Sequence, residues 1–383
     1  MKIALVLTKF NPARGGLEYW AWEYSRWLVR RGHDVHVLAC RFDERIAAEG
    51  EIRHTVPDRA SRVERADAFA AALDRLGPDV IHDMGAGWRY DILHPQGDSA
   101  VAVWHNNFRF LPLPLRVWKR LSRSQRQRYR DIAALERKQY VESDGLIVAV
   151  SDLVRRNIAT CFGVAPERFV VIPNGADTER FSPQRRVALR EQARQAFGVE
   201  KKVVCLAVAH NFDLKGVATA VRAIRRLARQ GVPVHLLVAG NGPVEKYRRM
   251  TTRLGVAASI TFLGFIDDSL RAYAAADIFV HPTWQDACSL VAIEAWACGL
   301  PVVTTPLNGA AELMTPGCEG LLLRQPGSAR ELAEHIRTLM DPAVRERMTG
   351  PARMLACRHN LAINFAAVEA VYERVLRRRA GGI

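Results

Sequence analysis

Residues 278–305 place a strand, a loop, a helix and a second strand in immediate succession, which constrains the fold more than any other stretch. Residues 278–280 are apolar with a β-branched start, as in a buried strand. Apolar residues then recur at helical spacing over 290–298, and Gly299 and Pro301 end the helix. An apolar pair after Pro301 begins the next strand. This alternation predicts an α/β fold with parallel strands.

Two carboxylates lie eight positions apart in this segment, Asp286 in the loop and Glu294 in the second helical turn. Between them, at Ser289 and Leu290, unpaired backbone N–H groups and a partial positive charge favour a phosphate. Acids on both sides of such a site are suited to the hydroxyl groups of a nucleotide-sugar. A turn aspartate and a solvated glutamate are the alternative, but a carboxylate inside an apolar run needs a partner or a ligand.

Glycines mark two further junctions between a strand and a helix. Gly15 and Gly16 follow the first apolar strand, but the third glycine of a dinucleotide-binding loop is missing, which argues against a nicotinamide cofactor. Lys215 and Gly216 follow the apolar strand 203–209 and offer a cation and close backbone approach to a phosphate. A purely structural turn and a solvent-exposed lysine are the respective alternatives.

His94 directly follows a predicted strand that ends at residue 93, and Asp98 comes four positions later. In open α/β sheets, ligands bind at the carboxyl ends of strands. His94 is therefore predicted by its position to be a site residue, with Asp98 as a weaker candidate. A purely structural histidine is the alternative interpretation.

At 383 residues, the chain is long enough for two domains with sizeable cores. It has no run of about 18 apolar residues, so no transmembrane helix is expected. The start, MKIALVLTKF, lacks a small-residue cleavage site and is interpreted as a strand rather than a signal peptide. The seven cysteines are scattered without metal-ligand spacing, which is typical of reduced residues in a cytoplasmic protein.

The net charge of +15 is the compositional outlier, and residues 110–130 carry seven cations without one acid. Leucine, valine and tryptophan are interspersed with these cations, as in segments that dock on an anionic bilayer. A long solvated helix is the alternative. A nucleic-acid surface is not expected, because no recognised binding motif accompanies the charge. The membrane-binding residues predicted here are Arg116, Trp118, Lys119, Arg120 and Arg123.

The carboxylate segment resembles the signature of the retaining family 4 glycosyltransferases. In that signature a glutamate, seven residues, a second glutamate and an alanine are followed by Gly-x-Pro-Val. Here Asp286 stands for the first glutamate, while Glu294, Ala295 and the run Gly-Leu-Pro-Val at 299–302 match the rest. Within the family, the chain most resembles the lipopolysaccharide core glucosyltransferase I type. The side chain of aspartate is one methylene shorter than that of glutamate. This difference is expected to affect which donor sugar is bound, but not the binding of the nucleotide.

The resemblance covers nearly the whole chain. Residues 173–177, Pro-Asn-Gly-Ala-Asp, match a turn that closes the first domain in the family, and residues 240–243 match its Gly-x-Gly-Pro turn. Family members carry an arginine near position 210, where this chain has a histidine. The donor-binding residues implied by the resemblance are Gly15, Gly16, His210, Gly216, Gly242, Phe265, Ser289 and Leu290.

The resemblance implies the GT-B fold, an α/β architecture of two Rossmann-like domains that face each other across a cleft. The implied parts are an acceptor-side domain over 1–185, a nucleotide-sugar donor domain over 186–358 and a C-terminal helix over 359–383 that crosses back to the first domain. The polar, charged stretch 182–202 is interpreted as a linker.

The implied activity is retaining transfer of a hexose, glucose from a UDP-sugar, to a cell-envelope glycan or lipid-linked acceptor such as lipopolysaccharide core. Lys215 and the helix start at Ser289 are expected to hold the leaving diphosphate. Glu294 is expected to bind ribose, and Asp286 and His94 the donor sugar. No cofactor and no metal are expected, because no Asp-x-Asp pair stands in a predicted cleft loop. No protein nucleophile is assigned.

Two other functions compete with this interpretation. Nucleotide-sugar 2-epimerases share the two Rossmann-like domains, but they lack the Pro-Asn-Gly and Glu-Ala signatures present here. A non-enzymatic basic membrane-binding protein accounts for the charge but not for the phosphate loops. The expected partners are a nucleotide-sugar donor, a glycan or lipid-linked acceptor and an anionic membrane surface, without nucleic acid. The expected location is cytoplasmic, peripheral on the inner face of the cytoplasmic membrane.

Overall fold

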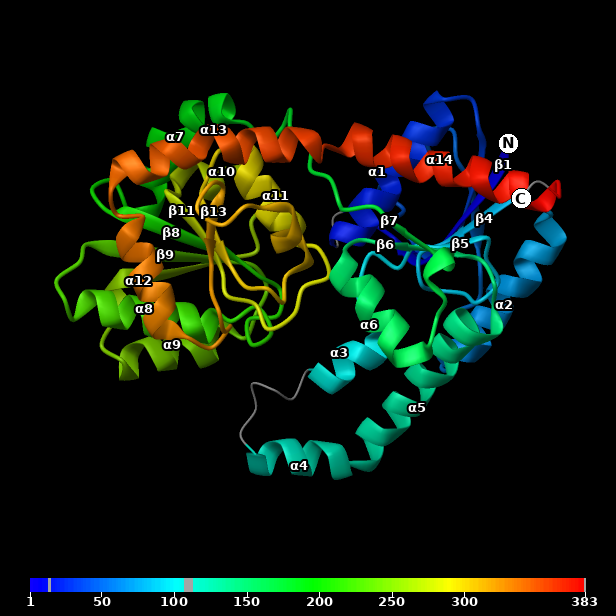
Figure 1. The fold of residues 1–383 in the computed structure, drawn as a ribbon, viewed down its shortest axis with the longest axis horizontal. Coiled ribbons are helices and arrows are strands. Elements are labelled where there is room, and N and C mark those ends of the chain that lie inside the picture. Colours follow the sequence, from blue (N-terminus) through cyan, green and yellow to red (C-terminus); the bar gives the residue numbers. More distant parts are fainter. Residues whose placement is uncertain (13–14, 107–112, 382–383) are drawn as a thin grey trace. The chain divides into compact units, whose positions relative to one another are not determined.

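The chain divides into two α/β units in the computed structural model (Figure 1). The structure describes residues 1–12, 15–106 and 113–381, apart from the side chains of residues 115, 119 and 120. The first unit comprises Met1–Pro173 and Asn364–Ile383, and the second comprises Asn174–Ile363. Each unit contains one parallel sheet with helices packed on it.

The first unit is built on a seven-stranded sheet in the order β3-β2-β1-β4-β5-β6-β7. The strands pair in parallel, and β1 pairs with β2 from Lys2↔Asp34 to Phe10↔Phe42. Chain direction across the sheet reverses between β1 and β4, the topological switch point at which such folds bind ligands. The strands are β1 (Lys2–Phe10), β2 (Asp34–Phe42), β3 (Ile52–Thr55), β4 (Val80–Asp83), β5 (Ile92–Leu93), β6 (Leu146–Ala149) and β7 (Phe169–Val171).

Helices cover both faces of this sheet, because right-handed crossovers in opposite directions place helices on opposite faces. The helical elements are α1 (Gly16–Arg30), α2 (Arg62–Leu76), α3 (Ala100–Asn106), α4 (Leu113–Leu121), α5 (Arg123–Arg137), η1 (Lys138–Glu142), α6 (Asp152–Phe162), η2 (Pro166–Arg168) and α14 (Leu361–Arg379). Trp20 on α1 donates a hydrogen bond to Asn364 on α14 (2.7 Å) and packs edge-on against Phe365. The last helix is therefore anchored in the core of the first unit.

The second unit contains a six-stranded sheet in the order β10-β9-β8-β11-β12-β13. Its switch point lies between β8 and β11, which pair in parallel at Ile278↔Cys205 and Phe279↔Leu206. The loops that follow these two strands therefore meet at the carboxyl edge of the sheet. The strands are β8 (Val203–Val208), β9 (Val234–Ala239), β10 (Ile260–Gly264), β11 (Ile278–His281), β12 (Val302–Thr304) and β13 (Gly320–Leu322).

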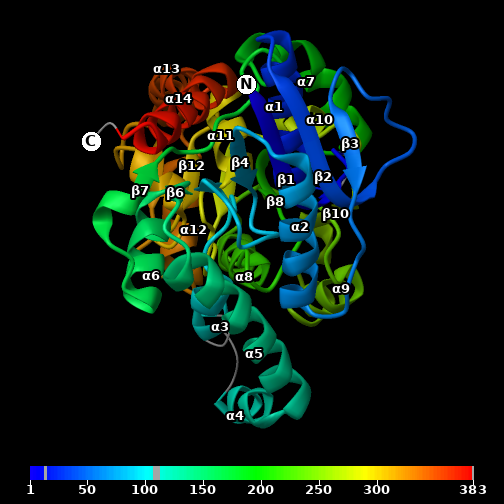
Figure 2. The ribbon, with the colours of Figure 1, turned by 90° about the vertical axis from the view of Figure 1, so that its right-hand side faces the viewer.

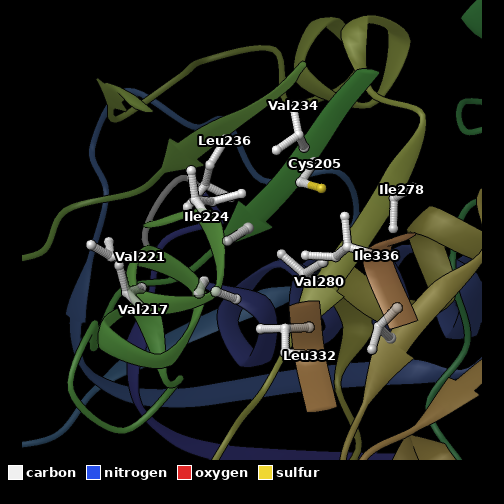
Figure 3. Packing of buried hydrophobic residues seen from close by; sticks show 14 of the residues in the cluster. Cys205, Val217, Val221, Ile224, Val234, Leu236, Ile278, Val280, Leu332 and Ile336 are labelled. Carbon is white, nitrogen blue, oxygen red and sulfur yellow. The ribbon is translucent and has the colours of Figure 1, made fainter. Parts of the chain in front are cut away.

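Two helical layers enclose the second sheet, with α8, α9 and α12 on one face and α7, α10, α11 and α13 on the other (Figure 1). Between the first layer and the sheet, apolar side chains such as Ile224, Leu236 and Leu332 form a buried core (Figure 3). The helical elements are α7 (Pro183–Phe197), α8 (Val217–Ala228), α9 (Val244–Arg253), η3 (Ala257–Ser259), α10 (Leu270–Ala275), α11 (Leu290–Ala297), η4 (Gly309–Leu313), α12 (Ala329–Thr338) and α13 (Pro342–Arg358).

The interpretation of 182–202 as a linker is wrong, because most of this stretch forms α7. The hydroxyl of Ser182 caps the helix, and two arginines attach it to the buried carboxylate of Asp277. Arg190 approaches one oxygen at 2.5 Å and Arg194 approaches the other at 3.2 Å. Burial raises the pKa of Asp277, but the two arginines outweigh burial and lower it overall. The polar residues of this stretch thus hold the helix through ion pairs, a contact that an apolar pattern cannot reveal.

Candidate functional site

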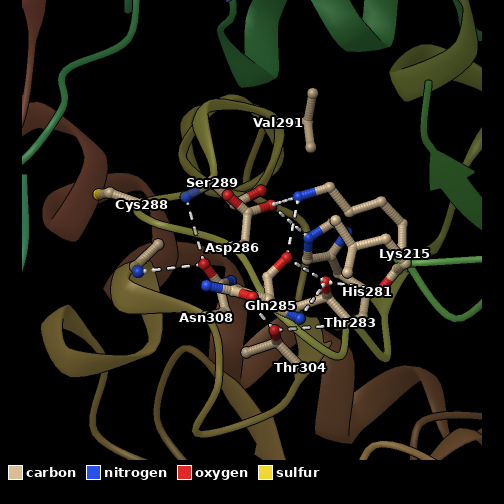
Figure 4. Close-up of polar contacts among 12 residues, drawn as sticks. Lys215, His281, Thr283, Gln285, Asp286, Cys288, Ser289, Val291, Thr304 and Asn308 are labelled. Atoms are coloured by element: carbon tan, nitrogen blue, oxygen red, sulfur yellow. Dashed lines mark hydrogen bonds and ion pairs between the residues drawn. The ribbon is translucent and has the colours of Figure 1, made fainter. Parts of the chain in front are cut away.

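The carboxyl edge of the second sheet brings two of the predicted residues into contact at the switch point. Lys215 lies in the loop after β8, and Asp286 lies in the loop after β11. The Lys215 Nζ atom is 2.5 Å from Asp286 Oδ2 and also donates to the backbone carbonyl of Gln285 at 3.2 Å (Figure 4). Both side chains keep some exposure, 22% for the lysine and 15% for the aspartate. A ligand entering at this edge can therefore reach both charges.

His281, the last residue of β11, contacts the same carboxylate. Its Nε2 atom lies 2.9 Å from Asp286 Oδ2, and its side chain is buried. Burial raises the pKa of Asp286, but the Lys215 charge and the His281 hydrogen bond outweigh burial and hold it well below its usual range. Burial lowers the pKa of His281, which favours a neutral ring that donates from Nε2. Both contacts engage Oδ2, and no contact within the described ranges engages Oδ1.

Asn308 organises the start of α11 beside this pair. Its Oδ1 atom accepts hydrogen bonds from the backbone N–H of Ser289 (3.2 Å) and of Ala310 (3.1 Å), and its Nδ2 atom donates to the Thr304 hydroxyl (Figure 4). The Ser289 hydroxyl is buried and has no hydrogen-bond partner among the described residues. The N–H groups of Leu290 and Val291 have no acceptor among the described residues, whereas those of Ala292 and Ile293 donate to the Ser289 carbonyl, so this end of the helix is suited to an anion.

Glu294 lies on the second turn of α11 with a defined partner. Its Oε2 atom accepts a hydrogen bond from the Tyr273 hydroxyl at 2.7 Å, and this hydroxyl is also 3.1 Å from the Val291 carbonyl oxygen. Burial raises the pKa of Glu294 to about 7, while the Tyr273 hydrogen bond and the Arg180 charge lower it in part. At neutral pH the protonated and the ionised forms of this carboxyl group are therefore present in similar amounts.

Two of the glycines that were predicted to bind the donor lie where close packing leaves no room for a side chain. Gly216 has a φ of +72°, and a Cβ atom there collides with the carbonyl oxygen of Pro282, so the close approach of the two loops at this position requires glycine. A Cβ atom on Gly242 collides with the ring of Phe212. Phe265 and His210 are both exposed, and the aromatic ring of the former is 51% accessible.

The remaining predicted residues belong to the first unit. Gly15 is the N-cap of α1, with extended backbone, and Gly16 is the first residue of that helix. His94 is fully buried, stacked on His82 at a centroid distance of 5.4 Å, and neither ring nitrogen has a hydrogen-bond partner within the described part of the chain. Burial lowers the pKa of His94 to about 3, so the ring is neutral. Asp98 accepts hydrogen bonds from the backbone N–H of Ser99 and from Asn157.

The predicted membrane segment forms α4 and the start of α5. Four apolar side chains of α4 are strongly exposed: Leu113 (68%), Val117 (50%), Trp118 (66%) and Leu121 (60%). Arg116 is partly exposed and Arg123 is exposed. Lys119 and Arg120 were also predicted to bind the membrane, but their side chains lie outside the described part of the structure. Nowhere in the described ranges is a helix long and apolar enough to span a bilayer.

Two functionally placed residues escaped the sequence analysis, His281 and Asn308. His281 is the last residue of β11 and His94 directly follows β5, so both lie at the carboxyl end of a strand and the same positional argument applies. Asn308 lies 19 residues after Ser289, and only the pairing of β11 with β12 brings the two together. No local pattern marks such a contact.

Two family models match the chain, one in each half. The model for Glycosyltransferase Family 4 matches residues 14–180, and the model for Glycosyl transferases group 1 matches residues 200–342.

Curated relatives include the lipopolysaccharide glucosyltransferase WaaG of Escherichia coli (strain K12), which is 30% identical over 213 residues. This match covers 55% of the chain and 57% of the relative. A D-inositol 3-phosphate glycosyltransferase of Geodermatophilus obscurus is 32% identical over 231 residues, which cover 57% of the chain and 50% of the relative. The matched region therefore spans about half the length of these two relatives.

Solved structures share the fold over the whole chain. The crystal structure of WaaG superimposes with a TM-score of 0.75 at 24% identity and covers 99% of this chain and 100% of its own. The Anabaena protein HepE, crystallised in complex with UDP-glucose, gives a TM-score of 0.74 at 20% identity over 97% of this chain and 100% of its own. These likenesses confirm the predicted GT-B fold with two Rossmann-like domains.

The raised pKa of Glu294 predicts a pH-dependent contribution to stability. Because its pKa rises from an ordinary 4.5 to about 7, the folded state holds a proton that the unfolded state has already released between these values. The free energy of unfolding of the wild type, relative to Glu294→Gln, should therefore fall between pH 5 and pH 7, by at most about 1.4 kcal/mol per pH unit. Urea unfolding of both proteins at several pH values measures this difference, and a difference independent of pH contradicts the assignment.

Proposed function

Because this chain belongs to the family 4 glycosyltransferases, we propose that it transfers glucose from UDP-glucose to a glycan acceptor, with retention at the anomeric carbon. The observation that carries the proposal is the contact of Lys215, Asp286 and His281 beside the start of α11. A cation, a carboxylate and open helix N–H groups at one sheet edge are the groups that a diphosphate and a sugar need. UDP-glucose is supported by the complex of HepE, which has the same fold.

The leaving diphosphate is stabilised by fixed positive charge. Lys215 faces it from one side, and the N–H groups of Leu290 and Val291 face it from the other. In the free protein, Asp286 balances the lysine charge and holds its ammonium group in place. Charges that are already oriented stabilise the charge developing on the leaving group without reorganisation, which is the main catalytic aid in the absence of a metal. No metal and no cofactor take part in this proposal.

The sugar and the ribose are bound by the two carboxylates. Asp286 offers Oδ1 to the donor sugar hydroxyls, because Lys215 and His281 engage Oδ2. Glu294 accepts hydrogen bonds from the ribose hydroxyls, with Tyr273 orienting its carboxyl group. The acceptor hydroxyl attacks the face from which the diphosphate leaves, guided by that phosphate, and no protein nucleophile is used.

The acceptor proposed here is a cell-envelope glycan or a lipid-linked glycan, of which lipopolysaccharide core is the example given by WaaG. The exposed apolar side chains of α4 support a location on the cytoplasmic leaflet, where a lipid-linked acceptor lies. Cations follow directly in α5, among them Arg123, and attract anionic lipid.

Removing either central charge should abolish most of the transfer activity. Lys215→Ala removes the cation at the diphosphate, and Glu294→Ala removes the ribose acceptor. Each loss of a preorganised contact should reduce turnover about a hundredfold to a thousandfold, or about 2.7–4 kcal/mol. Transfer of labelled glucose from UDP-glucose to a glycan acceptor measures the effect. Lys201→Ala and Glu200→Ala are matched controls, because these two residues are exposed and precede β8 at its amino end, away from the site at the carboxyl end. Near-wild-type turnover of either site variant, or a free 2-epimer as the product, refutes the proposal.

Asp286→Glu tests which part of the donor this carboxylate contacts. The longer side chain moves the carboxylate by one methylene within a tight contact to Lys215 and His281. Affinity for free UDP should stay within about threefold, because the base and ribose are bound elsewhere, while the rate or the sugar preference should change at least about tenfold. Calorimetry with UDP and kinetics with UDP-glucose and UDP-galactose separate the two effects. A large loss of UDP affinity places Asp286 at the nucleotide instead.

Truncating the apolar face of α4 should release the protein from anionic membranes. Trp118→Ala with Leu121→Ala removes two exposed side chains, each worth about 1.5–3 kcal/mol when buried in a bilayer. Partition into vesicles containing phosphatidylglycerol should fall at least about tenfold, and salt should weaken wild-type binding by screening. The control, Val187→Ala with Met354→Ala, removes two equally exposed apolar side chains from the second unit. Equal binding of both double variants in a sedimentation assay contradicts membrane docking by α4.

A further inference from the structure

A groove in the first unit lies between the start of α2 and the middle of α5. These two helices pack on each other (Figure 2). Its volume is about 620 Å³, within the range of small-molecule sites. On α5, positions 127, 130, 131 and 134 share one helix face and form one wall. The lining residues are Ala60, Ser61, Val63, Gln127, Arg128, Arg130, Asp131 and Ala134.

The groove carries an excess of positive charge. The side chains of Arg128 and Arg130 are exposed, and neither guanidinium group makes an ion pair or a hydrogen bond to another described residue. The cation paired with the groove's aspartate is Arg62, whose Nε atom lies 3.8 Å from Asp131 Oδ2. The one acid in the lining, Asp131, is already engaged by the start of α2. Its Oδ1 atom accepts from the backbone N–H of Arg62 (3.0 Å) and from the Ser61 hydroxyl (3.2 Å). Two guanidinium groups therefore remain available to an anion.

The chemistry of the lining selects the kind of anion. A guanidinium group presents paired N–H donors that match two phosphate oxygens, so arginines in a groove lining favour phosphate. The lining also includes the small apolar side chains of Ala60, Val63 and Ala134, which suit the C–H groups of a sugar ring. Among the described residues, no aromatic side chain lines the groove, which disfavours stacked nucleic-acid bases. The exposed apolar residues suited to lipid tails lie on α4 and are not part of this lining.

We propose that this groove binds the phosphate group of a phosphorylated sugar through Arg128 and Arg130. The inference deepens the proposed function, because it assigns the acceptor to the class of phosphorylated glycans. It rests on that function only for the statement that the sugar phosphate belongs to the acceptor. Binding of the phosphate itself is independent of any transfer.

Calorimetry with glucose 6-phosphate, inorganic phosphate and glucose tests the site without a nucleotide donor. The wild type should bind both phosphates and not glucose. Arg128→Gln with Arg130→Gln should weaken phosphate binding at least about tenfold, because two charged hydrogen-bonding groups are lost. Arg229→Gln with Arg253→Gln removes the same charge from exposed positions of the second unit and should leave the affinity unchanged. Equal weakening in both double variants means non-specific attraction and overturns the proposal.

Asp131→Asn is a variant that should raise the affinity for phosphate, whereas the double arginine variant should lower it. The amide oxygen can still accept from the Ser61 hydroxyl and the Arg62 N–H, but the competing negative charge is gone. Phosphate affinity should therefore rise several-fold, and thermal unfolding reports whether the start of α2 is intact. Unchanged or weaker phosphate binding by a folded Asp131→Asn protein contradicts the proposal.

Vesicles of phosphatidic acid distinguish a lipid headgroup from a sugar phosphate. If the double arginine variant loses vesicle binding but keeps its affinity for glucose 6-phosphate, the groove is a lipid site and the proposal is wrong. Loss of glucose 6-phosphate affinity with vesicle binding retained through α4 supports it. If glucose transfer is not detected in any assay, the phosphate-binding results remain valid. The proposal of glucose transfer and the proposal of phosphate binding in the groove can therefore be refuted independently.

Discussion

The site depends on the parallel pairing of β8 with β11. Parallel strands end at the same sheet edge. The direction in which successive strands are added across the sheet reverses between β8 and β11, so the loops after these two strands meet at that edge without an intervening helix. This constraint brings together Lys215 and Asp286, which are 71 residues apart in sequence. It also explains why Gly216 is needed, since the loop after β8 must pass against the Pro282 carbonyl to reach its partner. The chemistry of the second unit is thus a consequence of strand order.

Charge removed from water has to be paired, and the second unit satisfies this requirement in two different ways. Asp277 is enclosed by two arginines and a backbone N–H, and its ion pairs attach α7 to the sheet. Asp286 also has two partners, but its side chain and that of Lys215 remain partly exposed. The side chain of Asp277 is 8% exposed and that of Asp286 is 15% exposed. Asp277 lies at the amino end of β11 and Asp286 lies in the loop after it, at the edge of the sheet where ligands bind, and this position separates the structural aspartate from the candidate functional one.

In the first unit, apolar and cationic surfaces are separated along neighbouring helices. Exposed apolar side chains concentrate on α4, while Arg128 and Arg130 of α5 line the groove against α2. In Figures 1 and 2, α4 lies at the end of α5 that points away from the seven-stranded sheet. A single basic segment in the sequence thus provides two surfaces of different chemistry, one suited to a bilayer and one suited to a phosphate.

The α/β alternation, most strand positions, and Lys215, Asp286 and Glu294 as candidates could be predicted from the sequence, because apolar periodicity and junction residues are local signals. Helix α7 was missed, since it is held by ion pairs to Asp277 rather than by an apolar stripe. Tertiary structure alone decided that Lys215 bonds Asp286, that His281 and Asn308 complete the site, and that His94 is buried. These are contacts between loops far apart in sequence, and their partners are set by sheet order, which no local pattern encodes.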